Sequence, residues 1–227
     1  MSRYLITQTL ISSWNYMMSC YEGAEEQAYA DFLSTLNREH KDTTQEMLNG
    51  IEFESLVYSI ANGTFRLLEY PTGETVTAMG DTALFEKPEY PKWYSGARTV
   101  AERIMGAPVQ VKEYRGITIP HYGDLLLYGV LDALKAGTIY DVKFSNKSFG
   151  SAELAGKYLD SPQHPAYLYL VPEARNFVYL VSDGEDLYTE EYTRENSRPF
   201  GEIAREFLES LDAMNLLGVY REKWEAK

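Results

Sequence analysis

The sequence predicts a mixed α/β fold, and three observations lead to that prediction. Apolar residues recur at helical spacing through roughly the first 65 positions. Short β-type runs separated by glycine-containing turns follow between residues 109 and 142. The chain then returns to a helix, one further strand and a closing amphipathic helix. This order of helix, strands, helix and strand indicates a mixed sheet with helices against it.

Three helices are expected in the N-terminal part of the chain. The first two are separated at Gly23, and the third begins at a capping box and stops at Asn62-Gly63. Their expected ranges are Thr9 to Glu22, Glu25 to Arg38, and Thr43-Thr44-Gln45-Glu46 to about Ala61.

The remaining elements follow from turn residues and periodicity. Residues 64–95 are rich in turn formers and aromatics, which favours short strands or an ordered loop. A meander of three or more strands is expected between Val109 and Val142. Helices are expected at Ala97 to Met105 and at Pro199 to Leu217. A further helix is expected to begin with Ser161 as N-cap and with Pro162 and Pro165 in its first turn. The last expected strand is Phe177 to Val181.

Length and composition fit one compact domain over residues 1–227. The chain has 227 residues, and 44% of them are hydrophobic, which is ordinary for a globular protein. No apolar run approaches the roughly 20 residues that cross a bilayer, and no leader pattern is visible, so a cytoplasmic protein is expected. The single cysteine, Cys20, excludes an internal disulfide and an iron–sulfur cluster built by this chain alone.

The net charge of −13 opposes long-range attraction to nucleic acid. A bound metal ion inverts the sign of the field near a site, so acidity does not exclude a DNA-processing enzyme. It also leaves room for an acidic protein that binds a partner.

Two β-type runs each end on an acid. Gly129-Val130-Leu131-Asp132 and Thr138-Ile139-Tyr140-Asp141 are joined by a short connection, and a hairpin would bring Asp132 and Asp141 together. Paired carboxylates repel unless a cation lies between them, and Mg²⁺ prefers oxygen ligands. Lys143 is two residues past Asp141 and so shares its face, where it could orient or help deprotonate a water. The alternative is an ordinary ion pair at the strand ends.

Glu54 lies on the apolar side of the third expected helix, where an unpaired carboxylate is costly. A metal or a lysine would compensate it, and the alternative is a glutamate at the rim that reaches water. Gln163 and Tyr167 are four residues apart and project from one helix face. They could bind phosphate or position the lysine, or be a packed tyrosine with an incidental glutamine. The same spacing recurs at Gln110 and Tyr114 on an expected strand.

These residues, in this order, resemble the PD-(D/E)xK nuclease superfamily and its RecB-like, phage-type exonuclease branch. Gly50-Ile51-Glu52-Phe53-Glu54 looks like the first motif of that family, Gly129 to Asp132 like the second, and Asp141-Val142-Lys143 like the third. Gln163 to Tyr167 looks like the Gln-x-x-x-Tyr motif of the RecB branch. The similarity covers about residues 43–182, between a helical N-terminal part at 1–42 and a C-terminal helix at 198–220.

The resemblance implies a restriction-endonuclease-like core of helix, three-stranded meander, helix and strand. It implies Asp132 and Asp141 as ligands of Mg²⁺ or Mn²⁺, with the Val142 carbonyl helping and Glu54 a further ligand, direct or through water. Lys143 would activate or position water, and Gln163 and Tyr167 would support the site or bind DNA.

The implied activity is a metal-dependent exonuclease on linear, double-stranded DNA, of the phage or prophage recombination type. Its partners would be DNA, a single-strand annealing protein and further copies of the chain. Two alternatives remain: a structure- or sequence-specific DNA endonuclease of the same fold, and a non-catalytic acidic interaction protein derived from a nuclease. The three histidines, His40, His121 and His164, show no metal-ligand spacing and are expected to be structural or surface residues.

Overall fold

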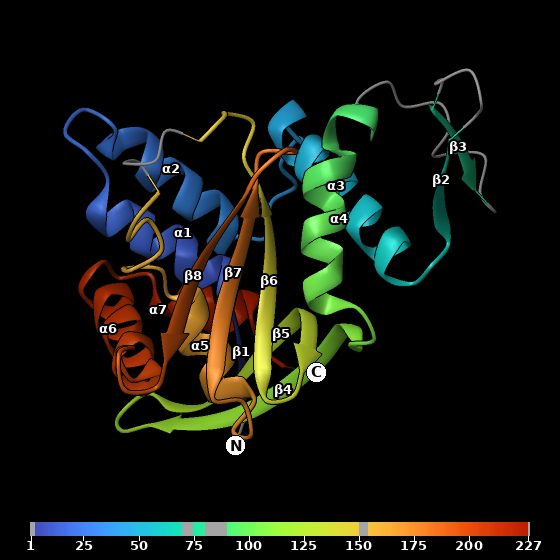
Figure 1. Ribbon diagram of the computed structural model, residues 1–227. Coiled ribbons are helices and arrows are strands. Elements are labelled where there is room, and N and C mark those ends of the chain that lie inside the picture. The colour runs from blue at the N-terminus through green and yellow to red at the C-terminus, as the bar shows by residue number, and fades with distance from the viewer. Residues whose placement is uncertain (1–2, 70–74, 80–89, 150–153, 227) are drawn as a thin grey trace.

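The computed structural model describes residues 3–69, 75–79, 90–149 and 154–226. Its centre is a six-stranded mixed sheet, as the sequence predicts (Figure 1). The strands of this sheet are β1 (Tyr4–Thr7), β4 (Val109–Ile119), β5 (Gly123–Lys135), β6 (Thr138–Phe144), β7 (Asn176–Ser182) and β8 (Leu187–Thr193). A separate two-stranded sheet is made by β2 (Phe65–Glu69) and β3 (Thr75–Met79).

The seven helices of the described chain pack beside this sheet or at its ends. They are α1 (Gln8–Ser19), α2 (Glu25–Leu36), α3 (Gln45–Ala61), α4 (Tyr90–Ile104), α5 (Gln163–Leu170), α6 (Phe200–Ala213) and α7 (Leu217–Lys223).

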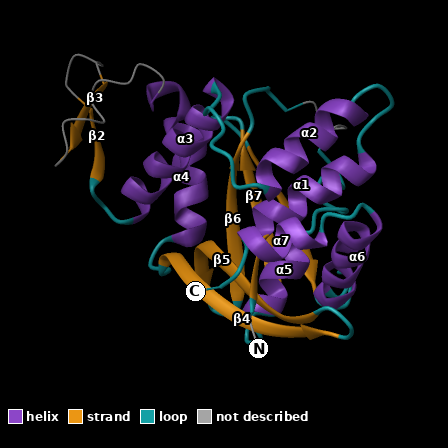
Figure 2. Ribbon diagram, turned by 180° about the vertical axis from the view of Figure 1, so that it is seen from behind, coloured by secondary structure: helices purple, strands orange, loops and turns teal. Residues whose placement is uncertain are grey.

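The hydrophobic core is divided in two by the sheet. One cluster joins α1, α2, α5, α6 and α7 to residues such as Leu127, Phe177 and Tyr179. The other joins α3 and α4 to Ala133, Val142 and Leu180. Figure 2, seen from behind relative to Figure 1, shows α5 and α7 in front of the sheet. Alternation along β6 therefore turns Tyr140, Val142 and Phe144 toward α3 and α4, and turns Ile139 and Asp141 toward α5.

β5 is the strand on which the whole arrangement depends. Antiparallel β4 lies along one of its edges over nearly its full length. The other edge is shared: β1 pairs in parallel with Leu125 to Tyr128, and β6 pairs with Ala133 to Lys135. The stretch 129–132 is left without a strand partner on that edge, and the candidate site lies there.

Several expected boundaries shift in the structure. The third helix is capped by Thr44, one residue later than expected, because Thr44 Oγ1 accepts the Met47 N–H. The fifth begins after Pro162, with Ser161 Oγ accepting the Gln163 N–H from outside the helix. The short helix expected from Ala97 starts at Tyr90.

The closing helix, expected to be continuous, is two helices. α6 ends at Ala213 and α7 begins at Leu217, and Asn215 between them has a positive φ of 59°, which a helix cannot contain. Strands β1 and β8 were not predicted, because β1 is four residues long and β8 carries adjacent glutamates, Glu190 and Glu191.

Candidate active site

The candidate site forms where β5 and β6 diverge. Their last paired residues are Ala133 and Tyr140, so Asp132 and Asp141 stand opposite each other one step further on. In place of a carbonyl of β5, the Oδ2 of Asp132 accepts the backbone N–H of Val142 at 2.8 Å. The predicted approach of the two acids is confirmed, and the carboxylate itself occupies the gap between the strands.

Asp141 is the more enclosed of the two acids, at 2% exposure. Its Oδ1 accepts a hydrogen bond from Gln163 Nε2 on α5. Its Oδ2 lies 2.7 Å from Lys143 Nζ, in an ion pair that lacks the geometry of a directed hydrogen bond. The Lys143 side chain is 36% exposed, so it links this buried carboxylate to solvent.

The charges of the site act strongly on one another. Burial raises the pKa of Asp132 well above its usual range, the charges of Asp141 and Glu54 raise it further, and Lys143 opposes them. Burial also raises the pKa of Asp141, against the lowering effect of Lys143 and Gln163. Burial alone would lower the pKa of Lys143, but the charges of Asp141 and Asp132 raise it above its ordinary value. Burial and the neighbouring carboxylates thus oppose ionisation of Asp132, and Lys143 favours it.

Glu54 reaches this region from α3. Its Oε1 accepts a hydrogen bond from the hydroxyl of Tyr58, one turn later, at 2.5 Å, and another from Gln110 Nε2 at 2.9 Å. Burial raises the pKa of Tyr58, and the charges of Asp132 and Glu54 add to this, so the phenol stays a donor. Glu54 is therefore compensated by an amide and a phenol rather than by a lysine.

Tyr167 and Gly129 close the side of the site formed by α5. The Tyr167 hydroxyl donates to the Val130 carbonyl at 3.0 Å, which satisfies part of the unpaired edge of β5. A Cβ on Gly129 would lie 2.7 Å from Tyr167 Cε1, so only glycine admits the ring there. Gln163 and Tyr167 are both buried, at 6% and 7% exposure. Of the two roles expected for them, this geometry fits support of the site, and direct contact with DNA stays a prediction.

The oxygen donors of Asp132 and Asp141 are of the kind that a divalent cation binds. Asp141 Oδ2 is buried without a directed hydrogen bond, which is the kind of acceptor that a cation satisfies. Mg²⁺ typically takes one or two carboxylates together with water and phosphate oxygens, and Asp132 and Asp141 fit that pattern.

The carboxylates of Glu54, Asp132 and Asp141 do not converge on one point as the sequence predicts. Across residues 3–69, 75–79, 90–149 and 154–226, no three His, Cys, Asp or Glu side chains are grouped closely enough to hold a metal ion. The hydrogen bonds of Glu54 Oε1 fit a role through water better than direct ligation. Direct ligation by Glu54 and by the Val142 carbonyl stays a prediction.

Two neighbours of the site, Gln110 and Tyr158, are not predicted as site residues by the sequence. The Gln-x-x-x-Tyr spacing at Gln110 and Tyr114 predicts no role for either residue, yet Gln110 contacts Glu54 while Tyr114 stacks on Tyr128. Tyr158 stacks on Tyr179, with ring centroids 4.1 Å apart. Burial raises the pKa of Tyr158 to about 12, against the lowering effect of the nearby Lys143 charge. No short-range pattern identifies Tyr158, because it lies in the loop before α5.

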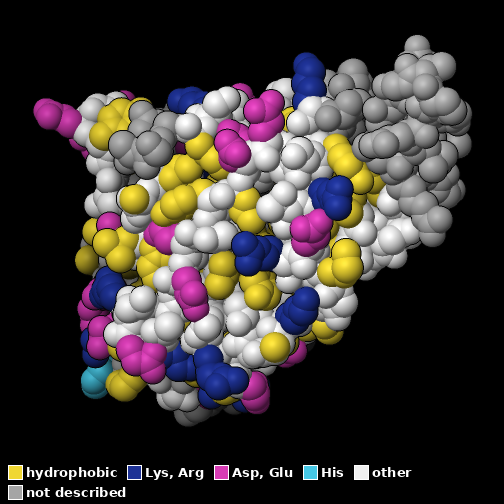
Figure 3. Space-filling model, in the orientation of Figure 1, with side chains coloured by type: hydrophobic (Ala, Val, Ile, Leu, Met, Phe, Trp, Pro, Cys, Tyr) yellow, Lys and Arg dark blue, Asp and Glu magenta, His cyan; other side chains and the backbone are white. Residues whose placement is uncertain are grey.

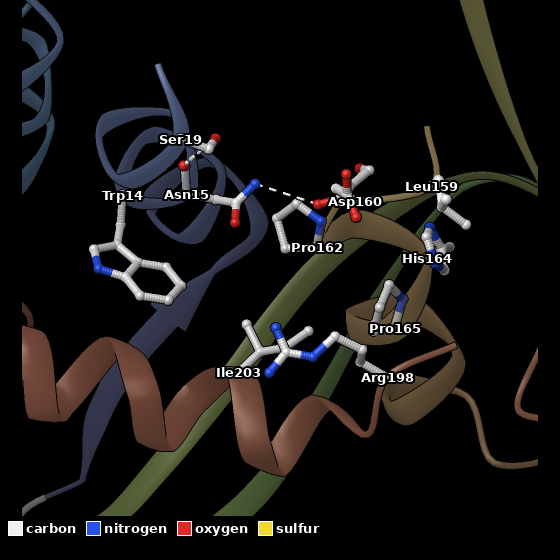
Figure 4. A pocket seen from close by; sticks show the side chains of 11 residues that line it. Trp14, Asn15, Ser19, Leu159, Asp160, Pro162, His164, Pro165, Arg198 and Ile203 are labelled. Carbon is white, nitrogen blue, oxygen red and sulfur yellow. Dashed lines mark hydrogen bonds between the residues drawn. The ribbon is translucent and has the colours of Figure 1, made fainter. Parts of the chain in front are cut away.

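A cavity of about 390 Å³ lies beside the first turn of α5, whose residues form part of its wall (Figure 4). Its wall includes Trp14, Asn15, His164 and Arg198, and Asn15 donates to the Asp160 carbonyl. None of the four expected catalytic residues lines it. His164 is buried against Tyr192, in agreement with the structural role expected for it.

Among the described residues on the face seen in Figure 3, basic side chains are not gathered into one large patch. Lysines and arginines occur there singly and in small groups among acidic and apolar side chains. No helix in the described part of the chain is both long and apolar enough to span a bilayer.

No protein-family model and no curated protein matches the chain. Among solved structures it is similar to SSO0001, at 13% identity and a TM-score of 0.47, over 94% of this chain and 77% of that one. It is also similar to an alkaline exonuclease, LHK-Exo, from Laribacter hongkongensis, at 12% identity and a TM-score of 0.42, over 96% of this chain and 92% of that one. The same exonuclease in complex with dAMP gives a TM-score of 0.43.

Proposed function

We propose that this chain is a divalent-metal-dependent deoxyribonuclease, acting as an exonuclease on linear duplex DNA. One observation carries the proposal: the buried Asp141 and the partly buried Asp132 face each other at a gap in the sheet, with the partly exposed Lys143 beside them. Such a pair is unfavourable as a structural element alone, because each charge raises the free energy of the other. A cation bound between them would remove that repulsion.

The donor set matches phosphodiester hydrolysis. Asp132 and Asp141 would hold Mg²⁺ or Mn²⁺, with the Val142 carbonyl and Glu54 contributing directly or through water. When bound, the cation supplies Lewis acidity toward a phosphate oxygen and lowers the pKa of a coordinated water. Lys143 would orient the attacking water or assist its deprotonation, from a side chain that reaches solvent.

The surrounding residues fix this machinery in place. Gln163 donates to Oδ1 of Asp141, and Oδ2, which lies 2.7 Å from Lys143 Nζ, would be shared between that ammonium group and the cation. The Val142 N–H holds one oxygen of Asp132 in the same way. Residues that orient metal ligands typically contribute tenfold to hundredfold in affinity or activity. Gln163 and Tyr167 are proposed as supporting residues that may be replaced only at that cost.

The test uses purified full-length protein with linear duplex DNA, closed circular DNA, Mg²⁺, Mn²⁺ and EDTA. We expect degradation of the linear substrate with either metal, none in EDTA, and loss of activity by at least about a hundredfold in Lys143→Ala and Asp132→Ala. Lys147→Ala, a change of an exposed lysine four residues away, is the matched control.

The outcomes separate the alternatives. Cleavage of closed circles at rates like those on linear DNA would assign the chain as an endonuclease. Wild type that is inactive with both metals on both substrates would reject the enzyme and favour an acidic interaction protein. Circular dichroism and thermal unfolding of each variant show whether a loss reflects the site or the fold. The proposed partners, an annealing protein and further copies of the chain, are tested by co-purification and by mass in solution.

A further inference from the structure

Gln110 has a backbone conformation that a strand does not require. Its φ is +53°, in the left-handed region that side chains other than glycine rarely adopt. Pairing between β4 and β5 passes from Val109 and Ala133 to Val111 and Leu131, so Gln110 stands opposite Asp132 without pairing with it. The strand is therefore irregular at the same level where β5 and β6 diverge.

The side chain of Gln110 makes two contacts with α3. Its Nε2 donates to Glu54 Oε1 at 2.9 Å and to the Tyr58 hydroxyl at 2.8 Å. The Tyr58 hydroxyl donates in turn to the same Glu54 oxygen. These three groups form a closed triangle of hydrogen bonds, in which Glu54 Oε1 accepts twice.

The triangle differs from an ordinary helix-surface contact because it crosses from α3 to the sheet. Tyr58 and Glu54 belong to the same helix, so their bond fixes the carboxylate only relative to α3. Gln110 adds the link to β4, at the residue facing Asp132. It is thus placed to set where the Glu54 carboxylate stands relative to the acids of the sheet.

A purely structural role for this link is poorly supported. α3 is already anchored by Phe53, Leu56 and Val57, which are fully buried in the cluster that contains Ala133 and Val142. Gln110 itself is exposed, so water competes for its two hydrogen bonds and reduces their net contribution to stability. An unfavourable backbone conformation that aims an exposed amide at Glu54 and Tyr58 points to a functional constraint.

We propose that Gln110 is a positioning residue, which acts through Glu54 to hold that carboxylate in register with Asp132 for the cation. This inference rests on the function proposed above. Gln110 is not itself placed in contact with metal or substrate. Its effect should therefore exist only while residue 54 carries a carboxylate.

Gln110→Gly separates position from stability. Glycine adopts φ +53° without strain, which offsets part of the stability lost with the two hydrogen bonds of the amide, so the variant should stay folded with a Tm close to that of wild type. We expect Mn²⁺ affinity to fall about tenfold by calorimetry, and kcat to fall by a similar factor with KM unchanged. The matched control is Ala136→Gly, which relieves a φ of +50° at the exposed turn between β5 and β6 and should leave both quantities unchanged.

A double-mutant cycle gives the decisive readout. In the Glu54→Gln background, Gln110→Gly should cause no further loss of Mn²⁺ affinity, because the group that it positions is gone. An equal loss in both backgrounds, or wild-type affinity in Gln110→Gly, would overturn the inference while leaving the nuclease proposal intact. Wild-type protein that neither binds Mn²⁺ nor cleaves DNA would overturn both.

Discussion

The carboxylate of Asp132 takes the place of a backbone carbonyl opposite Val142. Its Oδ2 accepts the Val142 N–H at 2.8 Å, one residue beyond the last backbone pair of β5 and β6. A charged side chain thus completes the edge of a strand and at the same time faces Asp141. This double use explains how two acids are held in the sheet without losing the hydrogen bonding of the backbone.

Asp132→Asn should stabilise the metal-free protein at neutral pH. Burial and the charges of Asp141 and Glu54 raise the pKa of Asp132, so its ionised form destabilises the folded state above the ordinary pKa. Asparagine keeps an oxygen to accept the Val142 N–H and removes the charge. A rise of a few degrees in Tm is expected in EDTA, where 1 kcal/mol corresponds to about 2–4 °C for a chain of this size.

Added Mn²⁺ should reverse that order. The wild type gains stability by mass action, about 2.7 kcal/mol at a hundred times Kd, and Asp132→Asn should gain far less. An Asp132→Asn protein that is less stable than wild type in EDTA would show that the carboxylate is structural first.

Gln163→Leu should weaken the site strongly, although the two side chains have similar volumes. The change removes the donor to Asp141 Oδ1 and leaves a buried, charged acceptor without it. Folding stability should fall by about 1–3 kcal/mol and Mn²⁺ affinity by tenfold or more. Denaturant unfolding and calorimetry measure the two effects. Gln27→Leu, at an exposed glutamine of α2, should change neither, and equal effects in both variants would contradict the role of Gln163.

Two glycine-to-alanine changes should have opposite signs. At Gly129 the new Cβ would lie 2.7 Å from Tyr167 Cε1 and 2.9 Å from Leu170 Cδ2, so α5 must shift, at a cost of about 1–3 kcal/mol. At Gly50, within α3, nothing lies within 4 Å, and alanine should stabilise by about 0.5–1 kcal/mol. Chemical denaturation of both variants checks the pair. A neutral Gly129→Ala would show that the contact between β5 and α5 is loose.

His164 should make the folded state sensitive to acid. Burial lowers its pKa from 6.5 to about 4, so between these values the unfolded chain binds more protons than the folded one. Stability contributed by the neutral ring is complete above pH 6.5 and declines as the pH falls toward 4, by about 1.4 kcal/mol per pH unit.

His164→Phe keeps the stack on Tyr192 and removes the titrating group. The difference between its stability and that of wild type, measured by urea unfolding from pH 4 to pH 7, should follow this slope. His40→Phe changes an exposed histidine and serves as the control. Parallel curves for His164→Phe and wild type would refute the assignment.

The sequence by itself determined most of the long helices, the central hairpin and the acid pair. Helical periodicity gave α1, α2, α3 and α6 to within a few residues, because each buries one apolar stripe. The hairpin joining two acid-terminated strands placed Asp132 opposite Asp141, and the period of two in a strand placed Lys143 on the same face as Asp141. These relationships are local, so spacing along the chain is sufficient to predict them.

Only the tertiary structure decided what surrounds that pair. β1 and β6 share one edge of β5 and leave residues 129–132 open, and α5 fills the gap with Gln163 and Tyr167. Gln110 is 56 positions from Glu54 in sequence, and a left-handed residue in a strand leaves no periodic signal. Such contacts join segments that come together only when the sheet is complete. These contacts compensate the carboxylates of the site, and the tertiary structure is needed to bring the compensating groups together.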